Sequence, residues 1–203
     1  MRYKNYVFDM GKVLVDYDAH LACKQFTNDE RIIEESFNVL FCSMEWAYLD
    51  CGLISDDEAW NSLSKRIKNE EVKRVSKECL YHWEEYCLWE IKGMKEILKQ
   101  IKDNASNIYL LSNVNSHIIH VQDKYMPYPE LFSGKCFSFD VNLMKPQKEI
   151  YKKFFNMFDL DPKTCFFIDD LPWNIKGAKE CGMDGYIHKN CDIEKLKKVL
   201  FEN

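Results

Sequence analysis

The stretch Tyr6-Val7-Phe8-Asp9-Met10-Gly11 places a carboxylate directly after a short apolar run, with a glycine two residues later. Val, Phe and Tyr favour β-strands, and Gly11 permits a tight turn at the end of the strand. A carboxylate at this point can attack phosphorus and can also bind Mg²⁺ through its second oxygen. Because Asp is also common in turns and helix caps, the stretch acquires meaning only together with other segments.

Three further segments place polar residues where an apolar run ends. They are residues 108–111 before Ser112-Asn113, Lys145 before Pro146, and residues 165–168 before Asp169-Asp170. In an open parallel α/β sheet the ligand site lies beyond the carboxyl ends of the strands, so these groups can converge. Ser112 and Asn113 form either an anion cradle or a plain helix cap. The ammonium of Lys145 would neutralise a phosphate, although a lone Lys is usually a surface residue.

The pair Asp169-Asp170 is the most specific of these signals. Adjacent carboxylates repel each other unless a cation or hydrogen-bond donors offset their charge. Only one of two successive side chains can point at a shared metal, so we expect the other to support the site or to hold Lys145. Asn174 is expected either to cap the next helix or to donate to the acidic pair. A simple turn before Pro172 is the structural alternative.

The remainder of the chain shows two patterns. Residues 17–92 contain no Pro and a single Gly, Gly52, and their apolar residues recur at helical spacing. About 70 helical residues are too many for a simple crossover. Ser55 and Glu58 are expected to form a capping box at a helix start, and residues 13–15 are expected to form a short strand. From residue 93 helices and short strands alternate, with one strand expected at residues 136–139, and this alternation is the signature of a doubly wound parallel sheet. We therefore predict an α/β protein with a Rossmann-like core, residues 1–16 and 93–203, and an inserted helical cap, residues 17–92.

Composition narrows the function classes. The 203 residues carry 28 basic and 33 acidic side chains, so no basic surplus indicates nucleic acid as a partner. No apolar stretch approaches the roughly 18 residues of a membrane helix, and none resembles a signal segment, so a cytoplasmic location is expected. The nine cysteines include no Cys-x-x-Cys pair, and we expect reduced thiols. Oligomeric state is not predicted.

Taken together, four motifs resemble those of the haloacid dehalogenase-like hydrolase superfamily. They are residues 8–16, 111–113, 144–151 and 167–178, the last continuing through Cys181-Gly182-Met183. In the helical region, Gly52-Leu53-Ile54-Ser55 is similar to the Gly-x-Ile-Ser segment of α-helical (C1-type) caps. The most similar subgroup contains the α-D-glucose-1-phosphate phosphatases and the N-terminal phosphatase domain of soluble epoxide hydrolases.

This resemblance implies Mg²⁺-dependent hydrolysis of a small phosphate ester, similar to a sugar phosphate, through an aspartyl-phosphate. By motif position, Asp9 is the nucleophile and a metal ligand, and Lys145 is the second catalytic residue. The other metal ligands are the backbone carbonyl of Gly11 and the carboxylate of Asp170. The implied phosphate ligands are Ser112, Asn113 and Lys145, supported by Asp169 and Asn174.

One position departs from the superfamily pattern. Phosphatases of the superfamily have an Asp two residues after the nucleophile, which serves as general acid and general base. This chain has Gly11 there, as the most similar subgroup does. Loss of a general acid–base typically slows a reaction by ~10²–10⁴. Asp16, Asp18 or a group of the substrate are the alternatives for that role, and the sequence does not choose among them.

Two alternative functions follow from the same residues. A protein that binds phosphate or a partner without efficient turnover is supported by Gly11. A metal-independent haloacid dehalogenase shares the Asp nucleophile but has no use for the pair Asp169-Asp170. The aromatic and His residues of residues 17–92 either face the leaving group or pack between helices; they are Trp46, Tyr48, Trp60, His82, Trp83, Tyr86 and Trp89. His20, His117 and His120 are expected at the surface or in packing.

Overall fold

The computed structural model describes residues 2–202. Five parallel strands form one sheet in the order β5-β4-β1-β6-β7. These strands are β1 (Asn5–Phe8), β4 (Asn107–Ser112), β5 (Phe132–Phe137), β6 (Cys165–Asp169) and β7 (Asp184–Ile187). A central first strand with later strands added on both sides is the doubly wound arrangement. The predicted α/β fold class is confirmed.

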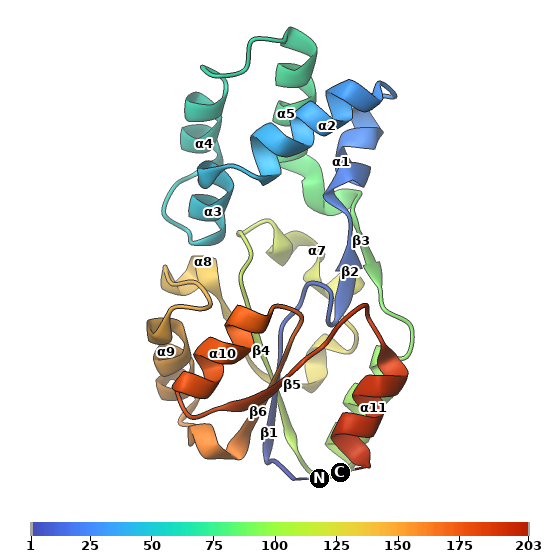
Figure 1. Ribbon diagram of the computed structural model, residues 1–203, viewed down its shortest axis with the longest axis vertical. Coiled ribbons are helices and arrows are strands. Elements are labelled where there is room, and N and C mark those ends of the chain that lie inside the picture. Colours follow the sequence, from blue (N-terminus) through green and yellow to red (C-terminus); the bar gives the residue numbers. More distant parts are fainter. Residues whose placement is uncertain (1, 203) are drawn as a thin grey trace.

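Alternate strand residues face two different helical layers, as expected from the twofold period of a strand. Val7 and Phe167 belong to the core beneath α9 (Lys148–Phe158) and α10 (Pro172–Glu180). The opposite face, which includes Phe8 and Ile168, packs against the other helices (Figure 1). The helices that contribute to this second core include α6 (Met94–Asp103), α7 (Ile118–Tyr125) and α11 (Ile193–Phe201).

A group of helices lies above the carboxyl ends of the strands, beyond a short antiparallel pair (Figure 1). The pair is β2 (Val15–Tyr17) with β3 (Leu88–Glu90). The helices are α1 (Ala19–Phe26), α2 (Glu30–Phe41), α3 (Met44–Asp50), α4 (Asp56–Leu63) and α5 (Glu70–His82), followed by the 3₁₀ helix η1 (Trp83–Glu85). We call this the helical region.

Polar residues in the sequence mark where these five helices begin. A polar side chain precedes each helix and accepts a hydrogen bond from the main-chain N–H groups of its first turn. The capping residues are Asp18, Asp29, Ser43, Ser55 and Asn69. The predicted capping box of Ser55 and Glu58 is present, with both reciprocal hydrogen bonds formed.

Two local predictions were wrong. The chain at residues 13–14 forms a turn rather than a strand, because the Met10 carbonyl accepts the Leu14 N–H at 2.8 Å. The strand predicted to run to Phe139 ends at Phe137, where α8 (Ser138–Val141) begins. There the Ser138 hydroxyl accepts the Val114 N–H at 2.9 Å, so the chain leaves the sheet.

Two predictions concern the chain as a whole. Among residues 2–202, no helix combines the length and the apolar character that crossing a membrane would require. All nine cysteines are free thiols, and six of them are buried, as expected for reduced core residues.

Candidate active site

Lys145 lies between two carboxylates at the carboxyl edge of the sheet. Its Nζ is 2.9 Å from Asp9 Oδ1 and 2.7 Å from Asp169 Oδ2. Asp9 follows β1 and Asp169 ends β6, and the parallel register that pairs Phe8 with Ile168 brings the two side by side. The Lys145 side chain is only 1% exposed. A buried ammonium is tolerable only with such partners, so this network is a single electrostatic unit.

Asn113 positions the segment that carries Lys145. Its side-chain amide donates to the Lys145 carbonyl at 2.9 Å and accepts the Lys145 N–H at 2.9 Å. Because one N–H and the oxygen of the amide are used in this way, a second side-chain N–H and the main chain of Asn113 remain to bind a phosphate. Ser112, the last residue of β4, lines the cavity described below and is 1% exposed.

Asn174 supports Asp169 from the first turn of α10. Its Nδ2 lies 3.0 and 3.1 Å from the two Asp169 oxygens, and the Leu171 N–H donates to Asp169 at 2.8 Å. Of the two expectations for Asn174, donation to the acidic pair is the one observed, since Leu171 precedes the helix as its N-cap residue. Asn174 Oδ1 is buried and has no hydrogen-bond partner among residues 2–202.

Asp9, Asp169 and Asp170 form an acidic cluster whose ligand atoms lie within 4.8 Å of one another. Three carboxylates face the one ammonium of Lys145, so a divalent cation would balance the remaining charge. The donors are all oxygens, which suits a hard cation such as Mg²⁺. The unpartnered Asn174 oxygen beside the cluster adds one more polar acceptor. The residues present therefore fit a magnesium ion.

The protonation of the cluster reflects its burial. Burial raises the pKa of Asp9 to about 7; the Lys145 ammonium opposes this shift and the Asp169 charge adds to it. Burial, together with repulsion by Asp169, raises the pKa of Asp170 to about 6. Burial alone would lower the pKa of Lys145, but the Asp9 and Asp169 carboxylates outweigh it and raise that pKa. A neighbouring cation would return the carboxylates to their charged forms.

A cavity of about 200 Å³ opens in front of these groups. Asp9, Gly11, Ser112, Asn113, Lys145, Asp170 and Asn174 line it from the sheet side. Its other wall includes Trp46 and Trp83, two of the seven residues of the helical region singled out in the sequence. Tyr17 and Asp50 also line the cavity, and sequence reasoning missed both.

The two carboxylates suggested as replacements for the acid–base are engaged elsewhere. Asp16 accepts a hydrogen bond from Lys12 Nζ at 2.5 Å. Asp18 caps α1 by accepting the His20 N–H at 3.0 Å. Neither is among the residues that line this cavity. Asp16 instead lines a second cavity of about 450 Å³, which shares Lys12 and Asp170 with the first.

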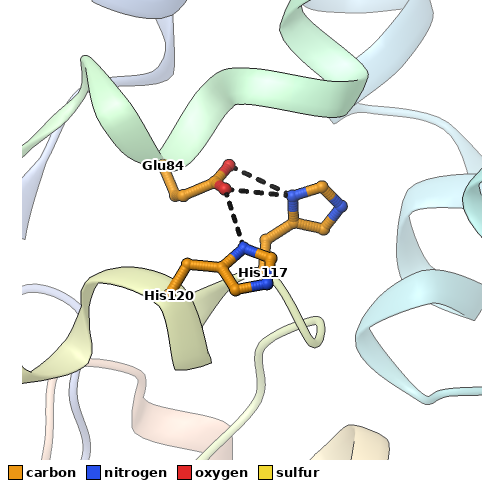
Figure 2. Close-up of side chains that lie close together, drawn as sticks. All are labelled: Glu84, His117 and His120. Atoms are coloured by element: carbon orange, nitrogen blue, oxygen red, sulfur yellow. Dashed lines mark hydrogen bonds and ion pairs between the residues drawn. The ribbon is translucent and has the colours of Figure 1, made fainter.

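A second ionic cluster joins the helical region to the core (Figure 2). His117, next to the start of α7, has Nδ1 at 3.2 Å from both Glu84 oxygens and Nε2 at 2.9 Å from Asp56 Oδ2. His120 Nδ1 lies 3.4 Å from Glu84 Oε1. The hydrogen bonds that the His117 ring donates to Asp56 and Glu84 outweigh burial and raise the pKa of His117 to about 9. We call Asp56, Glu84, His117 and His120 the bridging cluster.

The bridging cluster was not predicted from the sequence. His117 was expected at the surface or in packing; it is buried, and the sequence did not indicate its pairing with residues 33 and 61 positions away. Its pairing partners come from η1 and α4, so no local pattern around His117 indicates them.

The family model of haloacid dehalogenase-like hydrolases matches residues 3–182. The chain belongs to this family. This confirms the superfamily assignment and the prediction of a hydrolase of this type. Both the acidic cluster and the bridging cluster therefore belong to a haloacid dehalogenase-like hydrolase. The narrower resemblance to one subgroup stays a prediction.

Three curated relatives are similar to the chain. Flavin mononucleotide hydrolase 1 of Arabidopsis thaliana is 28% identical over 149 residues, which cover 73% of this chain and 58% of that protein. A sesquiterpene phosphatase of Aspergillus oryzae is 24% identical over 186 residues, covering 90% of this chain and 88% of the relative. A drimenol cyclase of Aspergillus calidoustus is 23% identical over 201 residues, covering 96% and 36%. The chain thus spans only part of the first and third proteins.

Solved structures show the same architecture. A haloacid dehalogenase-family enzyme of Bacteroides thetaiotaomicron, in complex with magnesium and inorganic phosphate, has a TM-score of 0.69 at 25% identity, covering 91% of this chain and 93% of the other. A predicted hydrolase of this type from Porphyromonas gingivalis has a TM-score of 0.73 at 20% identity over 100% of both chains, a likeness of fold alone. L-2-haloacid dehalogenase from Xanthobacter autotrophicus shares the fold at 13% identity, with a TM-score of 0.61 and coverage of 90% and 76%.

Proposed function

We propose that the chain is a magnesium-dependent phosphatase that hydrolyses a small phosphorylated metabolite, similar to a sugar phosphate, through an aspartyl-phosphate on Asp9. The observation that carries this proposal is the Asp9–Lys145–Asp169 network with Asp170 beside it, at the carboxyl edge of the sheet. A nucleophile, a phosphate-neutralising cation and an all-oxygen metal site then share one cavity.

In this proposal the metal ligands are the Asp9 and Asp170 carboxylates and the Gly11 carbonyl. A bound Mg²⁺ would supply charge neutralisation for the phosphoryl oxygens. Lys145, the Ser112 hydroxyl and the main chain of Asn113 hold the phosphate. Asp169 and Asn174 position Lys145, since Asn174 donates to the carboxylate that pairs with it.

The proposed reaction has two displacements at phosphorus. An Asp9 oxygen attacks phosphorus, the bond to the ester oxygen breaks, and the alcohol leaves with a proton. Water then attacks the phosphorus of the aspartyl-phosphate, the bond to Asp9 breaks, and inorganic phosphate leaves. The Lys145 ammonium stays beside the phosphoryl oxygens in both displacements, so it offsets the negative charge that develops on them.

We further propose that residues 17–92 act as the cap that receives the leaving group. Trp46 and Trp83 in the cavity wall favour a substrate with an apolar or ring-shaped organic part. The names of two relatives, a flavin mononucleotide hydrolase and a sesquiterpene phosphatase, are compatible with such a leaving group.

The test is a phosphate-release screen over sugar phosphates, nucleotides and small organic phosphates, with and without Mg²⁺. Asp9→Asn should abolish release, and chelation of the metal should do the same. Asp123→Asn, a matched change at an exposed Asp on α7, should leave the rate unchanged. Full activity of Asp9→Asn would exclude the covalent mechanism.

The second candidate is a phosphate-binding protein without efficient turnover, and the absence of a side chain at Gly11 favours it. Binding of Mg²⁺ and phosphate with no hydrolysis anywhere in the screen would support it. A metal-independent dehalogenase is disfavoured by the acidic cluster, and halide release from a 2-haloacid in the presence of chelator would support it instead.

A further inference from the structure

The ring of Tyr17 lies beside Gly11, the position at which the superfamily pattern has the acid–base Asp. A Cβ added to Gly11 would lie 3.1 Å from Tyr17 Cε1 and 3.5 Å from Cδ1. The aromatic ring at the end of β2 thus fills the space into which a side chain at position 11 would begin to extend. A phosphatase built on this backbone needs its proton donor to come from another direction.

Asp50 is a carboxylate on the opposite wall of the same cavity. It is the last residue of α3 and lines the cavity together with Asp9, Gly11 and Asp170. No ion pair of Asp50 occurs among residues 2–202, in contrast to Asp16, whose carboxylate is paired with Lys12. Asp50 therefore has no counter-ion that would keep it from acting on a ligand.

The core holds the segment around Asp50 in place over the cavity. The Ser138 hydroxyl of α8 donates to the Asp50 carbonyl. The Asn142 amide donates to the carbonyls of Cys51 at 3.0 Å and Gly52 at 2.9 Å. Gly52 has φ +67°, and a Cβ there would collide with the Phe139 main chain. Such fixed placement is what a group that must meet a reacting atom requires.

We propose that Asp50, supplied by the helical region, is the general acid–base of this hydrolase in place of the absent carboxylate at position 11. This inference rests on the proposed phosphatase function and names the residue that the proposed reaction lacks.

The proton balance is complete with Asp50 in this role. In the first displacement the protonated Asp50 gives its proton to the ester oxygen as the bond from that oxygen to phosphorus breaks, and Asp50 becomes a carboxylate. In the second, Asp50 takes a proton from water as the water oxygen bonds to phosphorus. The bond to Asp9 then breaks, Asp9 is released as a carboxylate, and Asp50 is again protonated for the next cycle.

The environment of Asp50 suits both halves of this cycle. Burial raises the pKa of Asp50 to about 7, and the Asn115 N–H acts against this shift. A pKa near the operating pH makes one group usable both as acid and as base. The ionisable groups that share its cavity are Tyr17, Asp9, Lys12, Lys145 and Asp170.

The experiment compares two leaving groups in Asp50→Asn. 4-Nitrophenyl phosphate has a leaving group that departs without a proton, whereas glycerol phosphate releases a strongly basic alkoxide. With the aryl ester we expect a burst of one nitrophenol per protein chain, followed by turnover slowed by ~10²–10⁴ because water lacks its base. With the alkyl ester we expect no burst and a similar loss.

Glu35→Gln, which neutralises an exposed carboxylate of α2, is the matched control and should behave as wild type with both esters. Asp50→Ser repeats the test with a different side chain, and the burst itself reports a folded site. Turnover of glycerol phosphate by Asp50→Asn within threefold of wild type would overturn the proposal. Loss of the nitrophenol burst to the same extent as the loss of glycerol phosphate turnover would also overturn the proposal, because it would make the role of Asp50 structural.

The failure of the underlying function has a different signature. Wild-type protein that releases no phosphate from either ester, or an Asp9→Asn variant that retains the nitrophenol burst, would overturn the aspartyl-phosphate mechanism itself. An active wild type with an inactive Asp9→Asn and an unaffected Asp50→Asn would overturn only the assignment of Asp50.

Discussion

Two clusters in this molecule place one cation between two carboxylates, yet they have different consequences. In the candidate active site Lys145 joins Asp9 to Asp169, all within the core. In the bridging cluster His117 joins Glu84 to Asp56, and so joins the core to the helical region. A Lys ammonium between two carboxylates stays charged throughout the physiological range, whereas a His cation is lost at high pH. The charges of the first cluster therefore persist across the physiological pH range, whereas a rise in pH weakens the second cluster.

The largest effect is expected from Lys145→Met. This change leaves Asp9 and Asp169 buried without their cation, and breaking a buried pair in this way typically costs ~3–5 kcal/mol. We expect a loss of this size in the free energy of unfolding, measured with urea in the absence of metal, together with loss of phosphate release. A loss below about 1 kcal/mol would show that Lys145 is not a structural counter-ion.

Gly52→Ala tests the contact that holds the helical region over the cavity. Its φ of +67° disfavours Ala by ~1–2 kcal/mol, and the collision with the Phe139 main chain adds to that cost. Gly182→Ala is the matched control, because its φ is +91° but the nearest atom, Pro162 Cβ, is 3.5 Å away. We expect Gly52→Ala to lower the thermal midpoint more than Gly182→Ala and to lower activity as well; equal midpoints would contradict this account.

The bridging cluster should make stability depend on pH. The pKa of His117 is raised to about 9 from an ordinary value of 6.5, so its stabilisation is fully present below pH 6.5 and is lost as pH rises through 9. We expect the difference in free energy of unfolding between wild type and His117→Gln to fall by ~1–3 kcal/mol from pH 6 to pH 10.

His82→Gln is the control for that titration. His82 Nδ1 also faces a carboxylate, Glu85, at 3.2 Å, but both side chains are about half exposed. Solvent screens such a pair, so its variant should differ from wild type by less than about 0.5 kcal/mol at every pH. A His117→Gln difference that is constant with pH would mean that His117 is not charged in the fold.

The smallest effect is expected from Lys148→Met. Lys148 Nζ is 2.9 Å from Glu180 Oε2, as close as Lys145 is to Asp9, but the two side chains are 54% and 43% exposed. Exposed pairs contribute ~0–1 kcal/mol, so urea unfolding should barely change. Comparing it with Lys145→Met measures what burial and a second carboxylate partner add to the loss.

Much of the fold was readable from local signals. The polar residues after β1, β4 and β6 were located correctly, because each follows a short apolar run. The helix start at Ser55 was predicted from its capping box, which involves residues only three positions apart. The strand end at Phe137 was missed because Ser138 bonds to Val114, 24 residues away, and no local pattern records that contact.

The residues of the candidate site also separate into those that the sequence singled out and those that it did not. Asp9, Lys145, Asp169 and Asp170 were singled out by residue type and by their places at the ends of strands. The use of the Asn113 amide to hold Lys145 was not predicted, since it depends on a loop 32 residues away. Asp50 was missed for a related reason, since it lines the cavity only because the helical region lies over the sheet. Tyr17 was missed because residues 13–14 form a turn, which brings the end of β2 back beside Gly11.

The sequence by itself determined the sheet, the helix starts and the chemical character of the core site, because strand propensity, capping and residue type act over a few neighbouring positions. Only the tertiary structure decided which groups face each other across the cavity, namely Asp50 opposite Asp9 and His117 between Glu84 and Asp56. Those contacts depend on how two separately patterned regions pack, and packing is a property of whole surfaces rather than of any local stretch of chain.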